Sequence, residues 1–342
     1  MKARDLRTLT LATVAAALLA AITLFTQVEG PELVLEDTRF FPDLVHQMET
    51  LKSVVVQEGT ATASLDWNGA RWVLREANNY PANQNSIAEL VIGLARLEKL
   101  EPKTSKSELY RHLDLQDPEV PNSRSTQIVL IDSEGHEIAN IIAGKLKYTL
   151  GGDERGTHVR VPSQPQSWLA RGEIDVGADP ADWLEQPLID IPSSAIRQIT
   201  VRRPSGEHLT IERNSSGTVD FDIRNVPAGR ELASPSTPLQ FAELLESLDI
   251  QDVSEAGNIS FENDNTISVD VEGLDGFVMQ IRMIELDGSH WIQFEGVTVS
   301  DEANEKFPSL GALKEKSQGR VFRVPQTQVS IYQKGLLELL EK

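Results

Sequence analysis

The chain has 342 residues, of which 40% are hydrophobic and 25% are charged, an ordinary globular composition. Acidic residues outnumber basic residues by 52 to 32, and the formal net charge of -20 disfavours binding to nucleic acids and to anionic lipid headgroups. Cysteine is absent, which excludes disulfides, thiol nucleophiles, thiolate metal sites and a lipid-modified cysteine.

The N-terminal residues predict a membrane anchor. Lys2, Arg4 and Arg7 precede an uncharged, mostly apolar stretch at 8–25, which is close to the roughly 20 residues that a spanning helix needs. No basic residue follows closely, so we expect the N-terminus in the cytoplasm and the bulk of the chain outside it. Residues 1–30 are therefore predicted to be the anchor and its flank, in a single-pass protein of the bacterial inner membrane with a periplasmic soluble region. An acidic linker at 29–37 follows.

Two other interpretations of this segment remain open. A cleaved signal peptide has the same order of charges, but Leu24 and Phe25 extend the apolar run beyond Ala20 and Ala21, and no clear Ala-x-Ala cleavage site follows. A helix in the core of a cytoplasmic protein is the third interpretation. Both the anchor and the signal peptide would export the soluble part.

Short strands and turns dominate the first part of the soluble region. The runs 54–56, 63–67 and 71–74 are typical of strands, and Asn68-Gly69 between two of them indicates a hairpin. A second hairpin is expected around 132–135, between 128–131 and 138–142. A strand at 157–161 should end at Pro162.

Two helices are predicted from capping and periodicity. Ser86 and Glu89 form a capping-box pattern, followed by an apolar face at helical spacing that comprises Ile87, Leu90, Val91, Leu94 and Leu97. Downstream, Thr237 is expected to cap a second helix, with Pro238 at its first helical position and Gln240 at the capping-box position. The apolar face of this helix comprises Phe241, Leu244, Leu245 and Leu248.

The order of elements recurs along the chain. The second set of strands falls at 199–201, 209–212 and 219–223, with a hairpin of 267–271 and 277–283 around 273–276. The segment 156–162 (GTHVRVP) matches 319–325 (GRVFRVP), so we expect the strands that hold Arg160 and Arg323 to be equivalent. These features predict an α+β fold in which the transmembrane helix is followed by two tandem repeats, 31–178 and 179–342, each of antiparallel strands with one packed helix. Two α+β domains that share this order by chance are the alternative.

A connecting helix is expected between the repeats. Asp179 suits the N-cap position, Pro180 the first helical position and Trp183 a buried site. A short leucine-rich helix at 335–340 closes the chain.

The histidines show no metal-ligand spacing, and a structural or surface role is the expectation for all six: His46, His112, His136, His158, His208 and His290. The acidic run 262–265 lacks the glycine and the terminal glutamate of a calcium-binding EF-hand loop, so a solvated loop is favoured over a calcium site. Trp168 and Trp183 are expected to pack against the domains, although they could line a ligand groove. Neither a phosphate-binding loop nor a Gly-x-Ser-x-Gly elbow is present.

A family resemblance emerges from several of these residues. The chain resembles the bacterial domain of unknown function 4340 family. The resemblance rests on the predicted anchor, on Trp72-Val73-Leu74 with Tyr80-Pro81-Ala82, on the segment 97–104 (LEKLEPKT), on Val159 to Pro162, on Trp168-Leu169, and on Asp182-Trp183-Leu184 running to Asp190-Ile191-Pro192. This resemblance implies one N-terminal membrane helix and a soluble region of repeated α+β units. It also implies a role beside auxiliary proteins of gliding-motility-type ABC transporters, and it carries no catalytic residues.

Two functions therefore remain. The favoured one is a non-enzymatic envelope protein that binds a protein partner and is accessory to an ABC-type membrane complex. It has no assigned catalytic, cofactor-binding or metal-ligating residue, no cofactor and no nucleic-acid partner. The alternative is an exported hydrolase that acts on an envelope polymer through paired carboxylates.

Overall fold

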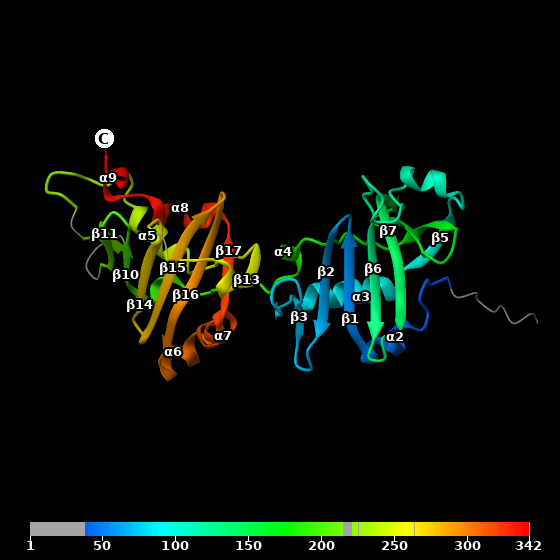
Figure 1. Ribbon diagram of the computed structural model, residues 1–342, viewed down its shortest axis with the longest axis horizontal. Coiled ribbons are helices and arrows are strands. Elements are labelled where there is room, and N and C mark those ends of the chain that lie inside the picture. The colour runs from blue at the N-terminus through cyan, green and yellow to red at the C-terminus, as the bar shows by residue number, and fades with distance from the viewer. Residues whose placement is uncertain (1–37, 153, 215–220, 225, 263, 342) are drawn as a thin grey trace, which may run out of the picture. The chain divides into compact units, whose positions relative to one another are not determined.

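The computed structural model describes residues 38–341, except 153, 215–220, 225 and 263. The predicted transmembrane segment at 8–25 and the linker at 29–37 lie outside the described residues. Among the helices that are described, none is long and apolar enough to cross a membrane. The chain from Arg39 onward forms one unit by its contacts, and it contains two mostly antiparallel sheets with a minority of helix (Figure 1).

The first sheet has nine antiparallel strands in the order β4-β3-β2-β1-β6-β7-β8-β9-β5. Its strands are β1 (Leu51–Glu58), β2 (Ala61–Trp67), β3 (Trp72–Leu74), β4 (Tyr80–Pro81), β5 (Glu98–Pro102), β6 (Thr126–Asp132), β7 (Glu137–Gly151), β8 (Glu154–Arg160) and β9 (Ser167–Arg171). Its helical segments are α2 (Leu44–Gln47), η1 (Met48–Thr50), α3 (Gln84–Ala95) and η2 (Ser107–His112). The long helix α3 runs along one face of this sheet (Figure 1).

The second sheet has eight antiparallel strands in the order β12-β11-β10-β14-β15-β16-β17-β13. Its strands are β10 (Ile196–Arg202), β11 (His208–Arg213), β12 (Phe221–Ile223), β13 (Asp252–Glu255), β14 (Ile267–Gly273), β15 (Phe277–Leu286), β16 (Ser289–Val299) and β17 (Arg320–Val324). The remaining helical segments are α4 (Pro180–Trp183), η3 (Ser193–Ala195), α5 (Thr237–Glu243), η4 (Ala256–Asn258), α6 (Asp301–Lys306), α7 (Pro308–Ser317), α8 (Gln326–Gln333) and α9 (Leu336–Leu339).

The chain visits corresponding positions in the two sheets in the same order. In each sheet a meander of strands, four (β1 to β4) in the first and three (β10 to β12) in the second, leads to a helix, α3 or α5, then to an edge strand and then to four more strands. The first strands also share a register irregularity against their neighbours, between Leu51 and Ser53 in β1 and between Ile196 and Gln198 in β10. Each irregularity lies three residues before a fully buried strand position, Val54 or Ile199.

The expected equivalence of the Arg160 and Arg323 strands is wrong. Arg160 ends β8, which pairs with β7 and β9, whereas Arg323 lies in β17, which pairs with β16 and the edge strand β13. In the first sheet the corresponding neighbour of the edge strand is β9. The shared Arg-Val-Pro sequence therefore lies in strands that occupy neighbouring, not equivalent, positions in the two sheets. A proline ends a strand locally because it cannot donate a backbone hydrogen bond, so the match does not require equivalent strands.

Two of the predicted helix starts also need correction. The helix α3 begins at Gln84, and its N-cap is Asn83, whose side chain accepts hydrogen bonds from the backbone of Asn85 and Ser86. Ser86 therefore lies inside the first turn, because asparagine caps at least as well as serine and comes first in the chain. Thr237 is the first helical residue of α5, with Ser236 at the N-cap position and no side-chain capping bond.

Other local predictions are confirmed. Asp179 caps α4 by accepting from the Ala181 backbone, and Trp183 is buried. The hairpins around 68–69, 132–135 and 273–276 are formed as the β2–β3, β6–β7 and β14–β15 pairs. The short helix near the C-terminus is α9.

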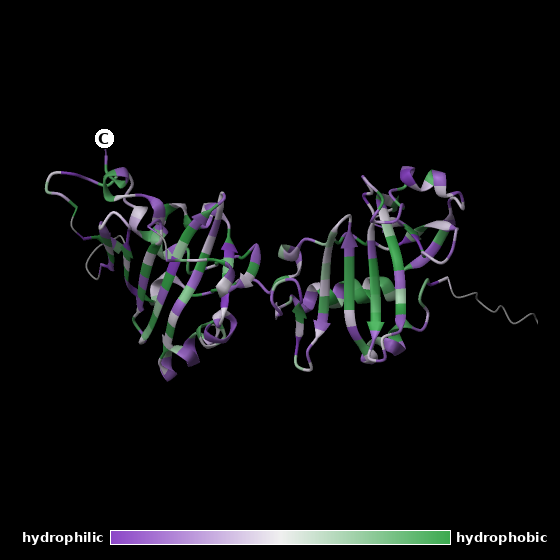
Figure 2. Cartoon of the chain, viewed as in Figure 1, coloured by the Kyte–Doolittle hydropathy of each residue, from purple (hydrophilic) through white to green (hydrophobic). Residues whose placement is uncertain are grey.

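The predicted helix faces are buried. Leu90, Leu94 and Leu97 are buried, and Figure 2 shows hydrophobic residues concentrated on α3 and on the strands beside it. Phe241, Leu245 and Leu248 are also buried, although α5 ends at Glu243 and the last two lie beyond it.

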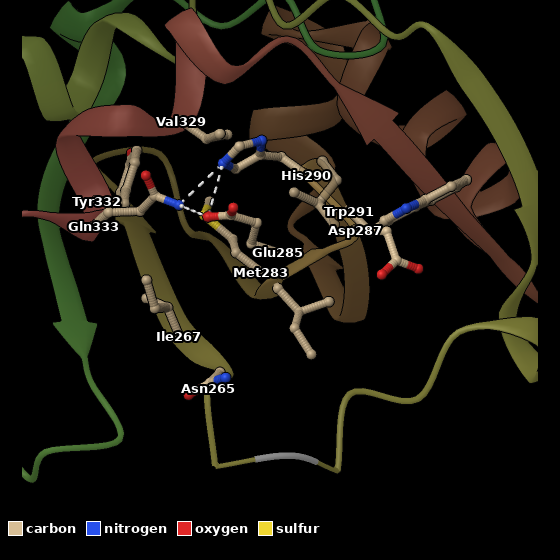
Figure 3. Close-up of a pocket in the computed structure, with 12 residues that line it drawn as sticks. Asn265, Ile267, Met283, Glu285, Asp287, His290, Trp291, Val329, Tyr332 and Gln333 are labelled. Carbon is tan, nitrogen blue, oxygen red and sulfur yellow. Dashed lines mark hydrogen bonds and ion pairs between the residues drawn. The ribbon is translucent and has the colours of Figure 1, made fainter.

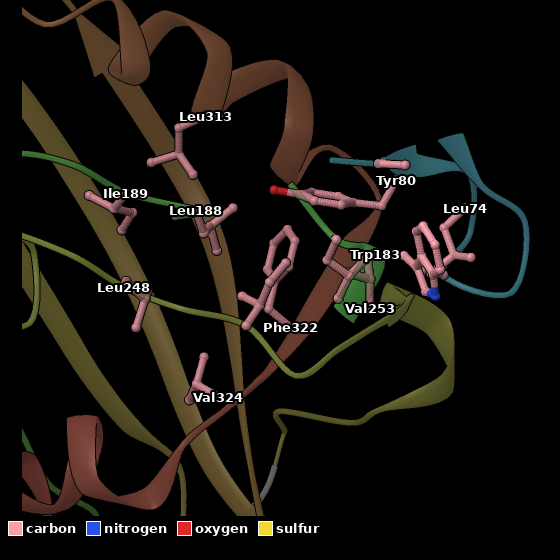
Figure 4. Close-up of a cluster of buried hydrophobic side chains, with 14 of the residues drawn as sticks. Leu74, Tyr80, Trp183, Leu188, Ile189, Leu248, Val253, Leu313, Phe322 and Val324 are labelled. Carbon is pink, nitrogen blue, oxygen red and sulfur yellow. The ribbon is translucent and has the colours of Figure 1, made fainter. Parts of the chain in front are cut away.

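The core of the second sheet includes the segment before it in the chain. Figure 4 shows Leu188 and Ile189 among the side chains of Phe322 and Val324 from β17. Ile189 forms an isolated bridge with Leu248. This bridge connects the segment after α4 to the end of α5.

Ion pairs cover the face of the second sheet that points away from this core. Arg197 pairs with Glu272 and Arg202 with Asp270, in each case between β10 and β14. Arg224 pairs with Glu212, and Arg282 with Glu295. Exposed pairs of this kind contribute little to stability, but they neutralise the carboxylates of this face.

Candidate functional site

A cavity of about 390 Å³ lies in the second sheet at the hairpin that joins β15 to β16. Asp287 and Gly288 form the two-residue turn, and both have positive φ, at 50° and 75°. That conformation defines a type I′ turn, for which Asp-Gly is a favoured sequence. The tight turn places Glu285 directly opposite His290 in the strand register.

The cavity has an apolar floor and a polar rim. The floor consists of Ile267 from β14, Met283 and Ile292 from the hairpin, and Val329 from α8. The polar groups of the rim belong to Glu285, Asp287, His290, Gln333 and Asn265 (Figure 3). Its volume falls in the range of roughly 300–1,000 Å³ that is usual for ligand sites, which also combine apolar walls with a few polar groups.

Three polar side chains of the rim form a hydrogen-bonded group. The Gln333 amide nitrogen donates to Glu285 Oε2 at 3.2 Å and lies 3.0 Å from His290 Nε2. Because a carboxylate only accepts, the amide must direct its NH₂ group toward Glu285. His290 Nε2 then accepts from the same group, which corresponds to the tautomer with the proton on Nδ1. His290 is only 6% exposed, so this arrangement gives a buried polar side chain a partner.

The helix that covers the cavity is held by buried hydrogen bonds. The Tyr332 hydroxyl donates to the Phe241 carbonyl oxygen at 2.5 Å, and burial raises the pKa of this phenol. Arg203 donates from Nη2 to the carbonyl oxygens of Tyr332 and Lys334 at the end of α8. These contacts fix Gln333 over the hairpin, so hydrogen bonds within the protein hold this wall of the cavity in place.

The cavity is electronegative. Among the residues that line it, the carboxylates of Glu285 and Asp287 have no lysine or arginine beside them. Within the described part of the chain, neither carboxylate forms an ion pair with a lysine or arginine, and Glu285 Oε2 lies 3.5 Å from His290 Nε2. This contrasts with the outer face of the same sheet, where Asp270 and Glu272 are each paired with an arginine.

A second hollow, the Asp182 groove, has a volume of about 580 Å³ and runs between α3 and the segment that leads to α4. Glu89, Asp175 and Asp182 line it together with Leu90 and Trp183. Burial raises the pKa of the Asp182 carboxyl, and the nearby charges of Asp179 and Glu58 raise it further. Among the described residues, no group of three or more histidine, aspartate or glutamate side chains could hold a metal ion.

The residues considered in the sequence are dispersed. His136 is exposed in the turn beside Asp132, and His158 Nδ1 lies 2.8 Å from the Lys145 carbonyl oxygen. Trp183 donates its indole N–H to the Gly177 carbonyl oxygen and also lines the Asp182 groove. In the acidic run 262–265, Asn265 reaches the rim of the cavity.

His290 was expected to be structural or on the surface, and it was not grouped with Glu285 and Gln333. One local signal was available, since Asp287-Gly288 predicts the turn that places Glu285 opposite His290. The covering helix α8 could not be placed from that signal.

The fold and the cavity define a mixed α/β protein with two antiparallel sheets and a preformed ligand-sized cavity in the second sheet. The sequence model for the domain of unknown function 4340 family matches residues 72–266, which is more than half of the chain, and the protein belongs to this family. No curated protein matches the chain significantly, and no solved structure does.

Proposed function

We propose that this chain is a non-enzymatic, single-pass envelope protein whose periplasmic region binds a protein partner, as an accessory subunit of an ABC-type membrane complex. The observation that carries the proposal is the cavity under α8, which is open at a hairpin tip and has carboxylates at its rim but no lysine or arginine in its lining. A preformed, apolar-floored cavity at an exposed turn is suited to receive a side chain from another protein.

Two further features support a binding role. The common strand order and the shared irregularity of β1 and β10 support an origin by tandem duplication, with repeats at 31–178 and 179–342. The anchor predicted at 8–25 would hold the periplasmic region beside membrane complexes. Tethering of this kind raises the effective concentration, so a modest affinity suffices.

The test is photo-crosslinking in cells. A photoreactive amino acid is placed at Asp287, on the hairpin tip, and in a matched chain at Glu295, on the outer face of the same strand pair. We expect mass spectrometry to identify a membrane-spanning subunit of an ABC-type transporter in the adduct from position 287, and none in the adduct from position 295. Adducts from position 287 without any membrane-complex subunit would contradict the proposal.

The topology has its own test. A reporter that is active only outside the cytoplasm, fused after Val28, should be active, and the full chain should stay with membranes during a carbonate wash. An inactive reporter would place the bulk of the chain in the cytoplasm. Release of a shortened soluble form would show a cleaved signal peptide instead.

The Asp182 groove favours a second candidate, the exported hydrolase. Glycoside hydrolysis uses two carboxyl groups about 5–9.5 Å apart, one of which acts as an acid with a raised pKa. Asp182 has a raised pKa and shares the groove with Glu89 and Asp175. This candidate requires that the purified chain degrade an envelope polymer and that Asp182→Asn abolish the turnover. Unchanged turnover in that variant, or none in the parent, would exclude this role of Asp182.

A further inference from the structure

We propose that the cavity under α8 binds a lysine side chain of the partner protein, with its aliphatic stem on the apolar floor and its ammonium group beside the Glu285 and Asp287 carboxylates. This assignment rests on the proposed function, because it names the chemistry by which that partner is recognised.

The residues at the rim of the cavity indicate that its ligand carries a positive charge. The lining contains the carboxylates of Glu285 and Asp287 and no lysine or arginine. The Gln333 amide nitrogen already bonds to both Glu285 Oε2 and His290 Nε2. A cationic group would supply the missing counter-charge, whereas a carboxylate or phosphate would be repelled. The net charge of -20 also attracts a basic partner over longer distances.

The geometry of the acceptors favours an ammonium over a guanidinium group. Glu285 Oε2 accepts from Gln333, so Oε1 is the oxygen of that carboxylate with no hydrogen bond among the described residues. Arginine gains most from a carboxylate that offers both oxygens in parallel. A lysine ammonium has three donors on a compact centre, so a single open acceptor such as Glu285 Oε1 is enough to receive it.

The floor suits the aliphatic part of lysine. Ile267, Met283 and Val329 present apolar side chains to the cavity around Glu285. Lysine typically lays its methylene stem along apolar surface while its charged end stays in a polar setting. An uncharged norleucine side chain would bury the same stem but leave both carboxylates without a counter-charge.

A methionine reporter makes this proposal testable on the full chain in detergent. The chain has four methionines, and Met283 lies on the cavity floor. The chain is labelled with ¹³C at the methionine methyl groups and titrated with Nα-acetyl-lysine methylamide. The norleucine, arginine and cadaverine counterparts serve as comparison probes.

We expect saturable movement of the Met283 signal with the lysine probe, and weaker binding of each comparison probe. Glu285→Gln should weaken the lysine probe by at least about tenfold, because it removes a carboxylate that the ammonium would contact. Asp287→Asn should also weaken it while keeping the turn, since Asn-Gly suits a type I′ turn. Glu295→Gln, on the outer face, is the matched control and should change nothing. Unmoved signals of Met48 and Met279 verify the fold of each variant.

Several results would overturn the assignment. An unmoved Met283 signal, or equal binding of the norleucine probe, would show that the carboxylates do not select a cation. Tighter binding of the arginine probe would show that the cavity recognises arginine and not lysine. Tighter binding of cadaverine would indicate that the ligand is a free amine and not a protein side chain.

Crosslinking in cells separates this proposal from the function on which it rests. A partner captured equally well by the Glu285→Gln chain would refute the lysine assignment and leave the binding function intact. If the lysine probe binds but no membrane partner is captured, the accessory function is refuted, and so is the recognition of a lysine from a partner protein. Only the affinity of the cavity for an ammonium group would then remain.

Discussion

The guanidinium group of Arg160 and the carboxylate of Asp117 are joined by a contact of 2.6 Å between Nη2 and Oδ1. Arg160 is 5% exposed, and its Nε also donates to the Leu115 carbonyl oxygen at 3.2 Å. The guanidinium carbon lies 4.7 Å from the centre of the Tyr110 ring. One side chain of β8 thus holds the segment that follows β5 against the sheet.

Arg160→Met should release this segment. The hydrogen bonds of a charged donor are lost, so we expect a decrease of about 1.5–3 kcal/mol in the free energy of unfolding, measured by chemical denaturation. Hydrogen exchange should accelerate at the amides of residues 110–117. The control is Arg155→Met, whose exposed pair with Glu173 should contribute less than about 1 kcal/mol. Equal effects of the two substitutions would show that burial of Arg160 does not matter.

Leu94→Ala should destabilise the first sheet and its helix. Leu94 is fully buried in α3, so the substitution removes apolar contacts and leaves a cavity at a cost of about 2–5 kcal/mol. Ile92 is on the same helix but 42% exposed, and Ile92→Ala should change stability by less than about 0.5 kcal/mol. Thermal unfolding of the two variants distinguishes the buried face from the solvent face. Similar losses in both would indicate that Ile92 packs against a partner.

The elements that the sequence predicted well depend on neighbouring residues. Turns such as Asn68-Gly69 and the Asp179 cap are specified by a few adjacent side chains, and the structure forms both. The buried face of α3 follows from helical spacing alone. Where two residues compete for one local role, as Asn83 and Ser86 do for the N-cap, the pattern is ambiguous and the prediction failed by one turn.

The elements that the sequence predicted poorly depend on strand pairing between residues that are far apart in the chain. The sequence match between 156–162 and 319–325 does not determine which strands pair with each segment. The structure places Arg160 in β8 but Arg323 at the position equivalent to β9. The cavity combines β14, the β15–β16 hairpin and α8, which are brought together only by the complete sheet. The sequence therefore pointed from His290 to Glu285 through the Asp287-Gly288 turn, but not to Gln333 of α8.

Replacement of two glycines by alanine, one at a time, should change the free energy of unfolding in opposite directions. A Cβ atom at Gly144 would lie 2.3 Å from the Leu113 carbonyl oxygen, so Gly144→Ala must displace backbone and should cost about 1–3 kcal/mol. A Cβ atom at Gly93 meets nothing within 4 Å inside α3, and Gly93→Ala should stabilise by about 1 kcal/mol through helix propensity. Urea unfolding of both variants measures the difference. Stabilisation by both would mean that β7 can move away from Leu113 without penalty.

The two aspartates with displaced pKa values predict opposite dependences of stability on pH. Burial raises the pKa of Asp182, so the folded state holds this proton more tightly than the unfolded state. The contribution of Asp182 is then greatest below the ordinary aspartate pKa of about 3.9 and is lost as the pH rises through the folded-state pKa. Asp182→Asn should therefore raise the melting temperature at pH 7 and have less effect near pH 3.

Asp132 is the matched opposite case. Hydrogen bonds from the backbone N–H groups of His136 and Glu134 lower the pKa of its carboxyl, with the largest effect from His136. A lowered folded-state pKa gives stability that is present above the ordinary aspartate pKa and lost as the pH falls through the folded-state pKa. Asp132→Asn keeps an acceptor oxygen but removes the charge, so it should lower the melting temperature at pH 7 and not in strong acid. Melting curves of both variants between pH 2 and pH 8 should diverge from the parent with opposite signs at neutral pH. Shifts of the same sign would contradict the assigned environments of these two carboxylates.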